Sequence, residues 1–151
     1  MLVNIIIAFI IPWIFGVYLY LKDRRIIILI GPFASVLAFT IDVIGFQLDY
    51  WHIKPFYDTE IFSALPFHWG IYPILTGYLI YFIMYKRFHR YLLITGFALI
   101  TTILELIGVL TGRVVYHNGW NIFFTFGSYL LPYTLTYLYF KKLRSMKILT
   151  D

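Results

Sequence analysis

Five long apolar segments dominate this sequence, at residues 2–21, 26–46, 66–85, 91–112 and 121–140. A helix of about 20 residues crosses the hydrocarbon core of a bilayer, which is roughly 30 Å thick. Every backbone N–H and C=O group inside lipid must bond within the protein, so segments of this kind fold as helices. The sequence therefore predicts an all-α polytopic bundle of five transmembrane helices, forming a single integral membrane domain over residues 1–151.

The composition supports this interpretation and excludes several classes of protein. Hydrophobic residues make up 62% of the chain and charged residues only 13%, whereas charged residues make up about 25% of a typical soluble domain. The absence of cysteine excludes disulfides, thiolate metal sites and a cysteine nucleophile. No P-loop, G-x-G-x-x-G or G-x-S-x-G motif occurs, which disfavours nucleotide hydrolysis and serine-hydrolase chemistry.

The positive charges predict how the chain is oriented. Most lysines and arginines form three clusters that alternate with pairs of apolar segments: Lys22, Arg24 and Arg25; Lys86, Arg87 and Arg90; Lys141, Lys142, Arg144 and Lys147. Such clusters mark cytoplasmic loops. We therefore expect a multi-pass protein of the cell membrane with its N-terminus and segments 47–65 and 113–120 outside and its C-terminus inside. The clusters indicate contacts with lipid headgroups and no binding of nucleic acid.

Small and polar residues recur along each segment at steps of three and four, which places them on one helix face. Helices in membranes associate through small residues and polar side chains, so these stripes are expected to form the bundle interior. They are Asn4, Ala8, Pro12 and Gly16; Gly31, Ser35, Ala38, Asp42, Gly45 and Asp49; Pro66, Gly70, Pro73 and Gly77; Ala98, Thr101, Glu105, Gly108 and Gly112; and Asn121, Thr125, Ser128, Pro132 and Thr136. Prolines within the spans are expected to kink their helices, with neighbouring helices bonding the freed carbonyls.

Two carboxylates, Asp42 and Glu105, lie within these apolar segments, and a glycine follows each three residues later. A charged side chain at the centre of a membrane helix costs roughly 2.5–3.5 kcal/mol on insertion scales. Both acids occupy interior stripes near the same end of helices that run in the same direction. We therefore expect them to form a pair that faces the protein interior, and the chain to contain an approximate parallel repeat in which they are equivalent.

The predicted site lies around these acids at the outer end of the bundle. The candidate catalytic residues are Asp42, Glu105 and His68, because two carboxyl groups in unequal surroundings can serve as a general acid and a charged partner. The alternative for the acids is a structural role in helix packing, and for His68 an interfacial position with its tip in water. The candidate ligand-binding residues are Trp51, Trp69, Tyr72, Arg113, Tyr116, Trp120 and Asn121. The tryptophans are alternatively residues of the aromatic belt at the membrane boundary.

No metal or other cofactor is expected. His52, His68, His117 and the acids are residue types that bind zinc or iron, but the chain contains no H-x-x-x-H or E-x-x-H spacing.

Several residues carry a resemblance to known families. The run Asp42-Val-Ile-Gly45 with Trp51, Leu65-Pro66, Tyr72-Pro73, Glu105 and Trp120-Asn121 resembles a family of small uncharacterised integral membrane proteins of bacilli and clostridia. That likeness implies five helices and no known activity. The spacing of Asp42, Trp51 and Leu65-Pro66 resembles, more faintly, the membrane cyclases of the lycopene and fungal meroterpenoid types. It implies acids that protonate an isoprenoid, although Phe67-His68 stands where the lycopene cyclases carry paired glutamates.

These observations lead to two functional hypotheses. In the first, an acidic, aromatic-lined cavity binds a membrane lipid or isoprenoid, with acid-catalysed chemistry as an extension. In the second, the protein is not an enzyme, and its buried acids hold helices or a partner subunit together. Ion or small-solute transport is a third possibility. Gly108-x-x-x-Gly112 is a pattern that could support a homodimer.

Overall fold

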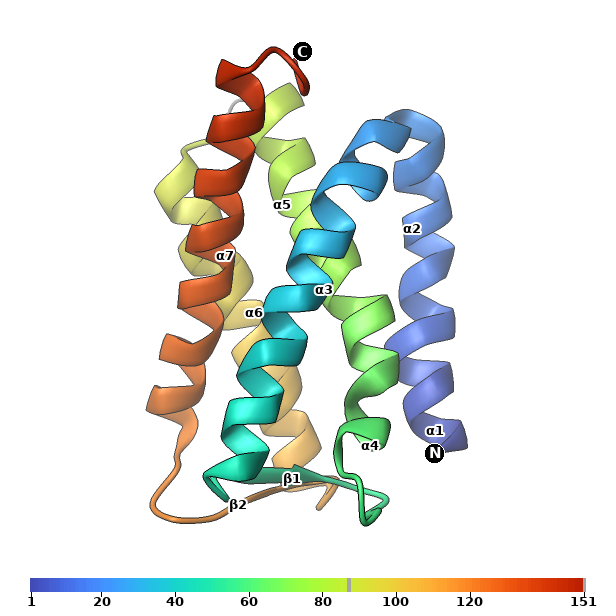
Figure 1. Cartoon of the computed structure of the whole chain (residues 1–151), viewed down its shortest axis with the longest axis vertical. Helices are drawn as coiled ribbons and strands as arrows, with labels where there is room; N and C mark the ends of the chain where they lie inside the picture. The colour runs from blue at the N-terminus through green and yellow to red at the C-terminus, as the bar shows by residue number, and fades with distance from the viewer. Residues whose placement is uncertain (87, 151) are drawn as a thin grey trace.

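The computed structural model describes residues 1–86 and 88–150 as five long helices with a two-stranded ribbon at one end (Figure 1). Two of the helices contain a π-helical turn and so consist of three parts each. The elements are α1 (Leu2–Ile5), the π-helical turn η1 (Ile6–Ile10) and α2 (Ile11–Lys22); α3 (Arg24–Gln47); β1 (Trp51–Ile53); α4 (Ile61–Pro66), the π-helical turn η2 (Phe67–Ile71) and α5 (Tyr72–Tyr85); α6 (Arg90–Leu110); β2 (Val114–Tyr116); and α7 (Ile122–Ser145).

Four of the helices are long and apolar enough to cross a membrane by length and composition: Leu2–Lys22, Arg24–Gln47, Ile61–Tyr85 and Arg90–Leu110. The fifth, α7, is not among them. Large apolar side chains are exposed on the outer faces of the helices, as with Leu21, Leu92 and Phe123, which is the surface expected of a protein in contact with lipid. The prediction of an all-α membrane protein is confirmed at this level.

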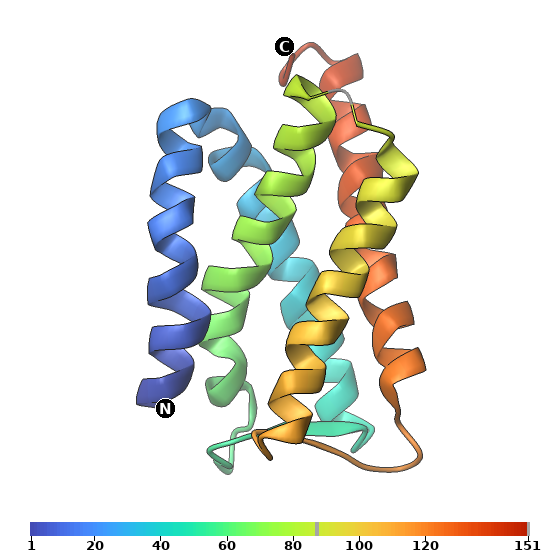
Figure 2. The ribbon, with the colours of Figure 1, turned by 180° about the vertical axis from the view of Figure 1, so that it is seen from behind.

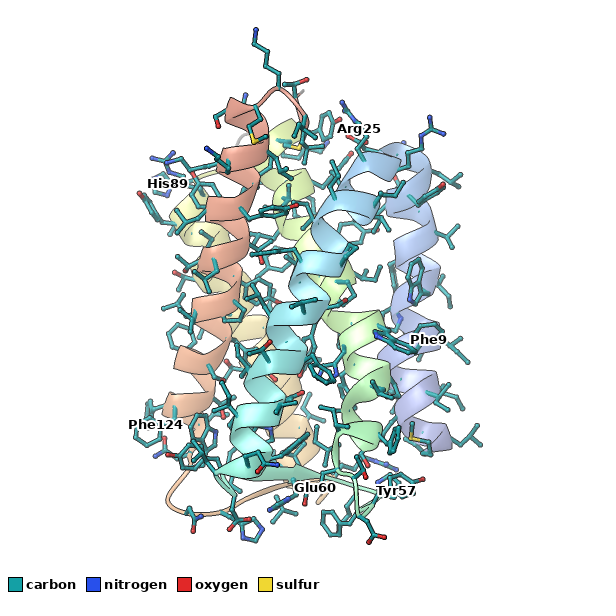
Figure 3. The ribbon with its side chains drawn as sticks, in the orientation of Figure 1. Phe9, Arg25, Tyr57, Glu60, His89 and Phe124 are labelled. Carbon is teal, nitrogen blue, oxygen red and sulfur yellow. The ribbon has the colours of Figure 1, made fainter. Side chains whose placement is uncertain are left out.

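The helices pack as two pairs and one flanking helix. Helix α3 lies along α5, and α6 lies along α7, while the N-terminal helix packs against α3 and α5 at one side of the bundle (Figure 2). The N-terminus and the ribbon lie at one end, and the C-terminus lies at the other (Figure 1). Arg25 and His89 lie at the C-terminal end, whereas Tyr57 and Glu60 lie at the ribbon end (Figure 3).

The predicted stripes face the interior. On the N-terminal helix, Asn4, Ala8, Pro12 and Gly16 are all buried, although this stripe has the least polar character of the five. The exceptions lie at helix ends: Asp49 and Asn121 are exposed. Small residues are thus placed where helix backbones approach one another.

Helix boundaries differ from the predicted ones by one to five residues, and three of the differences have a clear local cause. The third helix begins at Ile61 and not at residue 66, because Pro66 is accommodated inside the helix. The fourth helix ends at Leu110 and not at residue 112, because Gly112 adopts a positive φ of 66°. The last helix continues to Ser145, beyond the predicted end at residue 140, since basic side chains do not end a helix and suit its C-terminal turn.

Proline accounts for the π-helical turn in the third long helix. Pro73 is the second residue after η2 and has no N–H, so it cannot bond the carbonyl groups one turn before it. Two other helices supply the missing donors: Ser35 Oγ donates to the His68 carbonyl at 2.7 Å, and Trp13 Nε1 donates to the Trp69 carbonyl at 2.8 Å. The expectation that neighbouring helices bond the freed carbonyls is confirmed at Pro73.

Gly70 brings the two π-helical turns into contact. A Cβ atom at residue 70 would lie 1.9 Å from the Ala8 carbonyl oxygen and 2.6 Å from Phe9 Cα. Both are backbone atoms of the N-terminal helix and cannot move aside independently. Only glycine allows this approach, which holds the N-terminal helix against η2.

The helices α3 and α6 end in the same way. In α3, the Tyr50 N–H donates to the Gly45 carbonyl and the Asp49 N–H to the Phe46 carbonyl; in α6, Arg113 donates to Gly108 and Gly112 donates to Val109. These are the two bonds of a Schellman motif, and the residue at the turn has positive φ in both cases. The equivalent positions differ by 63 residues, as Asp42 and Glu105 do.

The ribbon extends this repeat. The strands β1 and β2 pair antiparallel, with Trp51 opposite Tyr116, His52 opposite Val115 and Ile53 opposite Val114. The 63-residue offset relates His52 to Val115, so the pairing is symmetric about these two residues. The predicted parallel repeat is therefore present at the ends of α3 and α6, with an approximate two-fold axis along the bundle.

Candidate functional site

Asp42 lies near the ribbon end of α3 and is 7% exposed. Trp51 Nε1 donates to its Oδ1 at 3.1 Å, and His68 Nε2 lies 2.6 Å from its Oδ2. Gly45 makes the first contact possible, because a Cβ atom there would lie 2.1 Å from the Trp51 ring. The glycine three residues after the acid thus provides the space in which the indole reaches the carboxylate.

His68 is 1% exposed and is positioned by η2. Its ring packs at an edge against Phe39 and is stacked near Tyr72. Its second ring nitrogen, Nδ1, is buried and has no hydrogen-bond partner among the described residues. The prediction that His68 could face the acids is confirmed for Asp42, and the alternative of a tip in water does not hold.

Glu105 is held by three hydroxyl groups. Tyr116 donates to Oε1 at 2.6 Å, Thr125 donates to the same oxygen at 3.2 Å, and Tyr129 donates to Oε2. The network continues to the Trp120 indole, which donates to Thr125 Oγ1 at 2.9 Å. Burial, followed by the nearby Glu105 carboxylate, raises the pKa of the Tyr116 phenol above its ordinary value, so this phenol remains a hydrogen-bond donor.

Tyr72 connects the two acid networks. Its hydroxyl lies 3.1 Å from that of Tyr129, which donates to Glu105, and its ring stacks near His68, which contacts Asp42. The two carboxylates are therefore joined through side chains. They are not joined by a direct hydrogen bond among the described residues.

Both carboxylates line a cavity of about 280 Å³ at the ribbon end of the bundle. Its walls are largely apolar and come from the N-terminal helix, α3, η2, α6 and the ribbon; they include Val3, Ile7, Trp51, Ile53, Leu104, Ile107 and Val114. The polar lining includes Asn4, Tyr72, Arg113 and Tyr129. A second cavity of about 30 Å³ also touches Asp42, Tyr72 and Tyr129, and this volume is enough for a water molecule.

Three of the predicted ligand-binding residues, Trp51, Tyr72 and Arg113, line the larger cavity. Arg113 is half-buried there, and no ion pair to it occurs within residues 1–86 and 88–150. Tyr116 does not line the cavity but holds Glu105, which does. Whether these residues bind a ligand stays a prediction.

The other three predicted residues lie elsewhere. Trp69 is 60% exposed on the outside of the bundle because its neighbour His68 takes the inward position. Asn121 is exposed and caps α7 by accepting from the Phe123 and Phe124 N–H groups, a standard role for asparagine before a helix. Trp120 packs against Trp51 with ring centroids 4.7 Å apart, so it supports the cavity wall from behind.

Sequence reasoning missed Tyr129 and the role of Thr125. Tyr129 contacts Glu105 and Tyr72, but it lies on α7 among many aromatic residues and carries no distinguishing spacing. The interior stripe includes Thr125 but does not identify its partner, Glu105. The stripe itself was the available signal, since Tyr129 follows Thr125 by one helical turn.

A polar cluster lies outside the cavity on the ribbon. His52 Nε2 lies 2.5 Å from Asp49 Oδ1, and His52 Nδ1 lies 2.7 Å from Glu60 Oε1. Burial opposes a charge on His52, but the two carboxylates outweigh it and raise the pKa of this imidazole. No group of three His, Asp or Glu side chains in the described part of the chain has the geometry of a metal site.

Comparisons with protein families, with characterised proteins and with solved structures found no match to this chain.

Proposed function

We propose that the protein binds a lipid or isoprenoid in the cavity at the ribbon end of the bundle. The observation that carries this proposal is that one largely apolar cavity of about 280 Å³ is lined by both Asp42 and Glu105. Small-molecule sites typically measure 300–1,000 Å³ and combine apolar walls with a few polar groups. The cavity is slightly smaller than that range, which favours a single slender chain over a two-chain lipid body.

The lining residues that are exposed on the outside of the bundle indicate how such a ligand would enter. Val3 and Ile7 of the N-terminal helix form one edge, and Leu104 and Ile107 of α6 form another. All four side chains are at least 36% exposed on the outer surface of the bundle. An apolar ligand would therefore enter sideways from the bilayer, between the N-terminal helix and α6.

Acid-catalysed chemistry of the cyclase type receives less support. Each oxygen of Asp42 and Glu105 has a partner on the protein, namely an indole, an imidazole or hydroxyl groups. Both groups thus act as acceptors, and a proton on either acid would have to displace one of these donors. We propose binding and do not extend the proposal to catalysis.

The hydrogen bonds of the two acids favour the second candidate function, in which the acids hold helices together. Glu105 of α6 bonds two residues of α7, and Asp42 of α3 bonds His68 of η2. The two functions differ in whether the cavity has an occupant.

The occupancy can be tested by purifying the protein in mild detergent and identifying bound lipids by native mass spectrometry. A Leu104→Trp variant places an indole at the side opening, and Ile103→Trp is the matched control, because Ile103 is exposed on the same helix and does not line the cavity. We expect a bound lipid in the unaltered protein and the control, and its loss from Leu104→Trp. Retention of the same lipid by both variants, or absence of any lipid from the unaltered protein, would contradict the proposal.

We further propose five membrane spans, with the ribbon outside and the C-terminus inside the cell. Helix α7 supports a fifth span because it is as long as α3, with 24 residues each, and packs along α6. The basic clusters support the orientation. Cysteines introduced at Lys54 and Arg144 should react with a membrane-impermeant reagent from opposite sides, and labelling of both from the same side would rule out five spans.

A further inference from the structure

A second site lies at the opposite end of the bundle from the proposed ligand cavity. An open groove of about 700 Å³ is formed where α5 ends, α6 begins and the last turns of α7 pass beside them. Figure 2 shows these three helix ends gathered near the C-terminus, and Figure 3 shows His89, which lines the groove, beside α7. The groove is independent of the acidic cavity and of its proposed ligand.

Among the described residues, those that line this groove carry positive charge only. Arg90, Lys141 and Arg144 line it, and none of the described residues that line it is acidic. The guanidinium of Arg90 lies 5.8 Å from the centre of the Tyr137 ring and 5.1 Å from that of Tyr91. These ring contacts hold Arg90 in place at the edge of the groove.

The first turn of α6 adds to the positive potential. This helix has 21 residues and begins at Arg90 with no side-chain cap and no acidic residue in its first turn. The free N–H groups at such an end carry a partial positive charge. An anion in the groove would therefore meet backbone donors as well as the basic side chains.

The floor of the groove is apolar, because the lining residues Met84 and Phe140 are buried, and Ile83 and Phe88 add further apolar lining. Phe88 is itself exposed. The groove lies at the ends of the candidate spans Ile61–Tyr85 and Arg90–Leu110, which is the depth at which phospholipid headgroups lie. A site that is basic at its rim and apolar at its floor matches a lipid better than a free anion.

We infer that this groove binds the phosphate headgroup of an anionic membrane phospholipid. The basic side chains and the start of α6 contact the phosphate, and the apolar floor contacts the glycerol and the first carbons of the chains. Basic pockets between membrane helices are known to hold such headgroups.

The test measures binding of phosphatidylglycerol and phosphatidylcholine to the purified protein by native mass spectrometry. The groove variant is Arg90→Gln with Lys141→Gln. The matched control is Lys22→Gln with Arg24→Gln, which removes the same charge from exposed residues at the same end of the bundle outside the groove. At about 1 kcal/mol for each basic residue near anionic lipid, the groove variant should bind phosphatidylglycerol about 30-fold more weakly. The control should change binding by less than about twofold.

Three results would overturn the inference. Equal losses in the two double variants would indicate diffuse surface charge, and equal binding of the two lipids would show that the headgroup charge is not recognised. Inorganic phosphate that binds alone and displaces the lipid would indicate a site for free anions.

Two further measurements cover the case in which the groove variant does not fold. The exchange Arg90→Lys with Lys141→Arg keeps the charge and should retain binding. Binding to the unaltered protein should weaken as salt is raised, because salt screens the contact; affinity independent of salt would also overturn the inference.

Discussion

Asp42→Asn is predicted to destabilise the protein, whereas Glu105→Gln is predicted to be nearly neutral. Both substitutions replace a carboxylate with an amide of the same shape, but the partners of the two acids differ. The partners of Asp42 are the indole N–H of Trp51 and the imidazole of His68. An indole can only donate, so the amide oxygen of an asparagine must face Trp51 and its NH₂ group must face His68.

His68 then has to change its tautomer. In the unaltered protein Nε2 donates to the carboxylate; beside an NH₂ group it must accept, and the hydrogen moves to Nδ1. Nδ1 is buried without a partner within the described residues. A buried N–H group without an acceptor costs about 1–3 kcal/mol, which is the expected loss in the free energy of unfolding.

Glu105 has more adaptable partners. Tyr116 and Thr125 can continue to donate to the remaining oxygen of a glutamine. Its NH₂ group would donate to the Tyr129 hydroxyl, which can rotate to donate to Tyr72. Tyr72 lines the cavity, where its own hydrogen can meet water. The expected change is therefore within about 1 kcal/mol.

The assay is unfolding of both variants in detergent micelles, followed by circular dichroism. The control is a double-mutant cycle with His68→Ala, since removing the imidazole removes the mismatch and the two losses should not add. Equal stability of Asp42→Asn and Glu105→Gln, or additive losses in the cycle, would refute the tautomer reasoning.

Three further predictions concern other parts of the molecule. Burial opposes a charge on His52, but Asp49 and Glu60 raise the pKa of this imidazole in the folded protein. The stability that His52 contributes is therefore complete below the unfolded pKa of about 6.5 and is lost as pH rises through the folded pKa. The free energy of unfolding measured across pH should show this loss, and His52→Gln should abolish it. Gly70→Ala should lower the free energy of unfolding by about 1–3 kcal/mol, because its Cβ atom would clash with backbone atoms. Gly96→Ala has open space around it and should be neutral or stabilising in the same unfolding assay. Asn121→Ala should cost about 1 kcal/mol by removing the cap of α7, measured as a lower midpoint of thermal unfolding, and an unchanged midpoint would contradict that role.

The interior of the bundle was predictable because small residues in a membrane helix favour the contacts between helices. Lipid and leucine are equally apolar, so Ala8 or Gly16 on a helix gains nothing from lipid and gains close contact from another helix. The same reasoning located Asp42 and Glu105 on inward faces. It did not identify their partners, since tyrosines such as Tyr129 occur on every face of these helices.

The ribbon was not predicted from the sequence. Its strands have three residues each, too few for an alternating pattern to be recognised. The glycine after each acid was visible, but its role depends on Trp51 and Val114, which pack on Gly45 and Gly108. Each of these contacts joins residues on either side of the turn that ends a helix, where the helical periodicity stops, so one-dimensional periodicity does not contain them.

The third long helix shows why Trp69 lies on the exterior although its neighbour His68 is buried. In the most apolar 18-residue stretch of this helix, half of the residues are buried inside the molecule, compared with 28–33% in the other three candidate spans. The reason is that this helix packs on both the N-terminal helix and α3. A helix with two buried sides has no single interior stripe: Gly70 faces the N-terminal helix and His68 faces Asp42. At 3.6 residues per turn, two positions this close in sequence lie on opposite sides, which leaves only the side of Trp69 for the exterior. A histidine away from the small-residue stripe of a central helix is therefore still a candidate for a buried site, provided that a second helix is available to cover it.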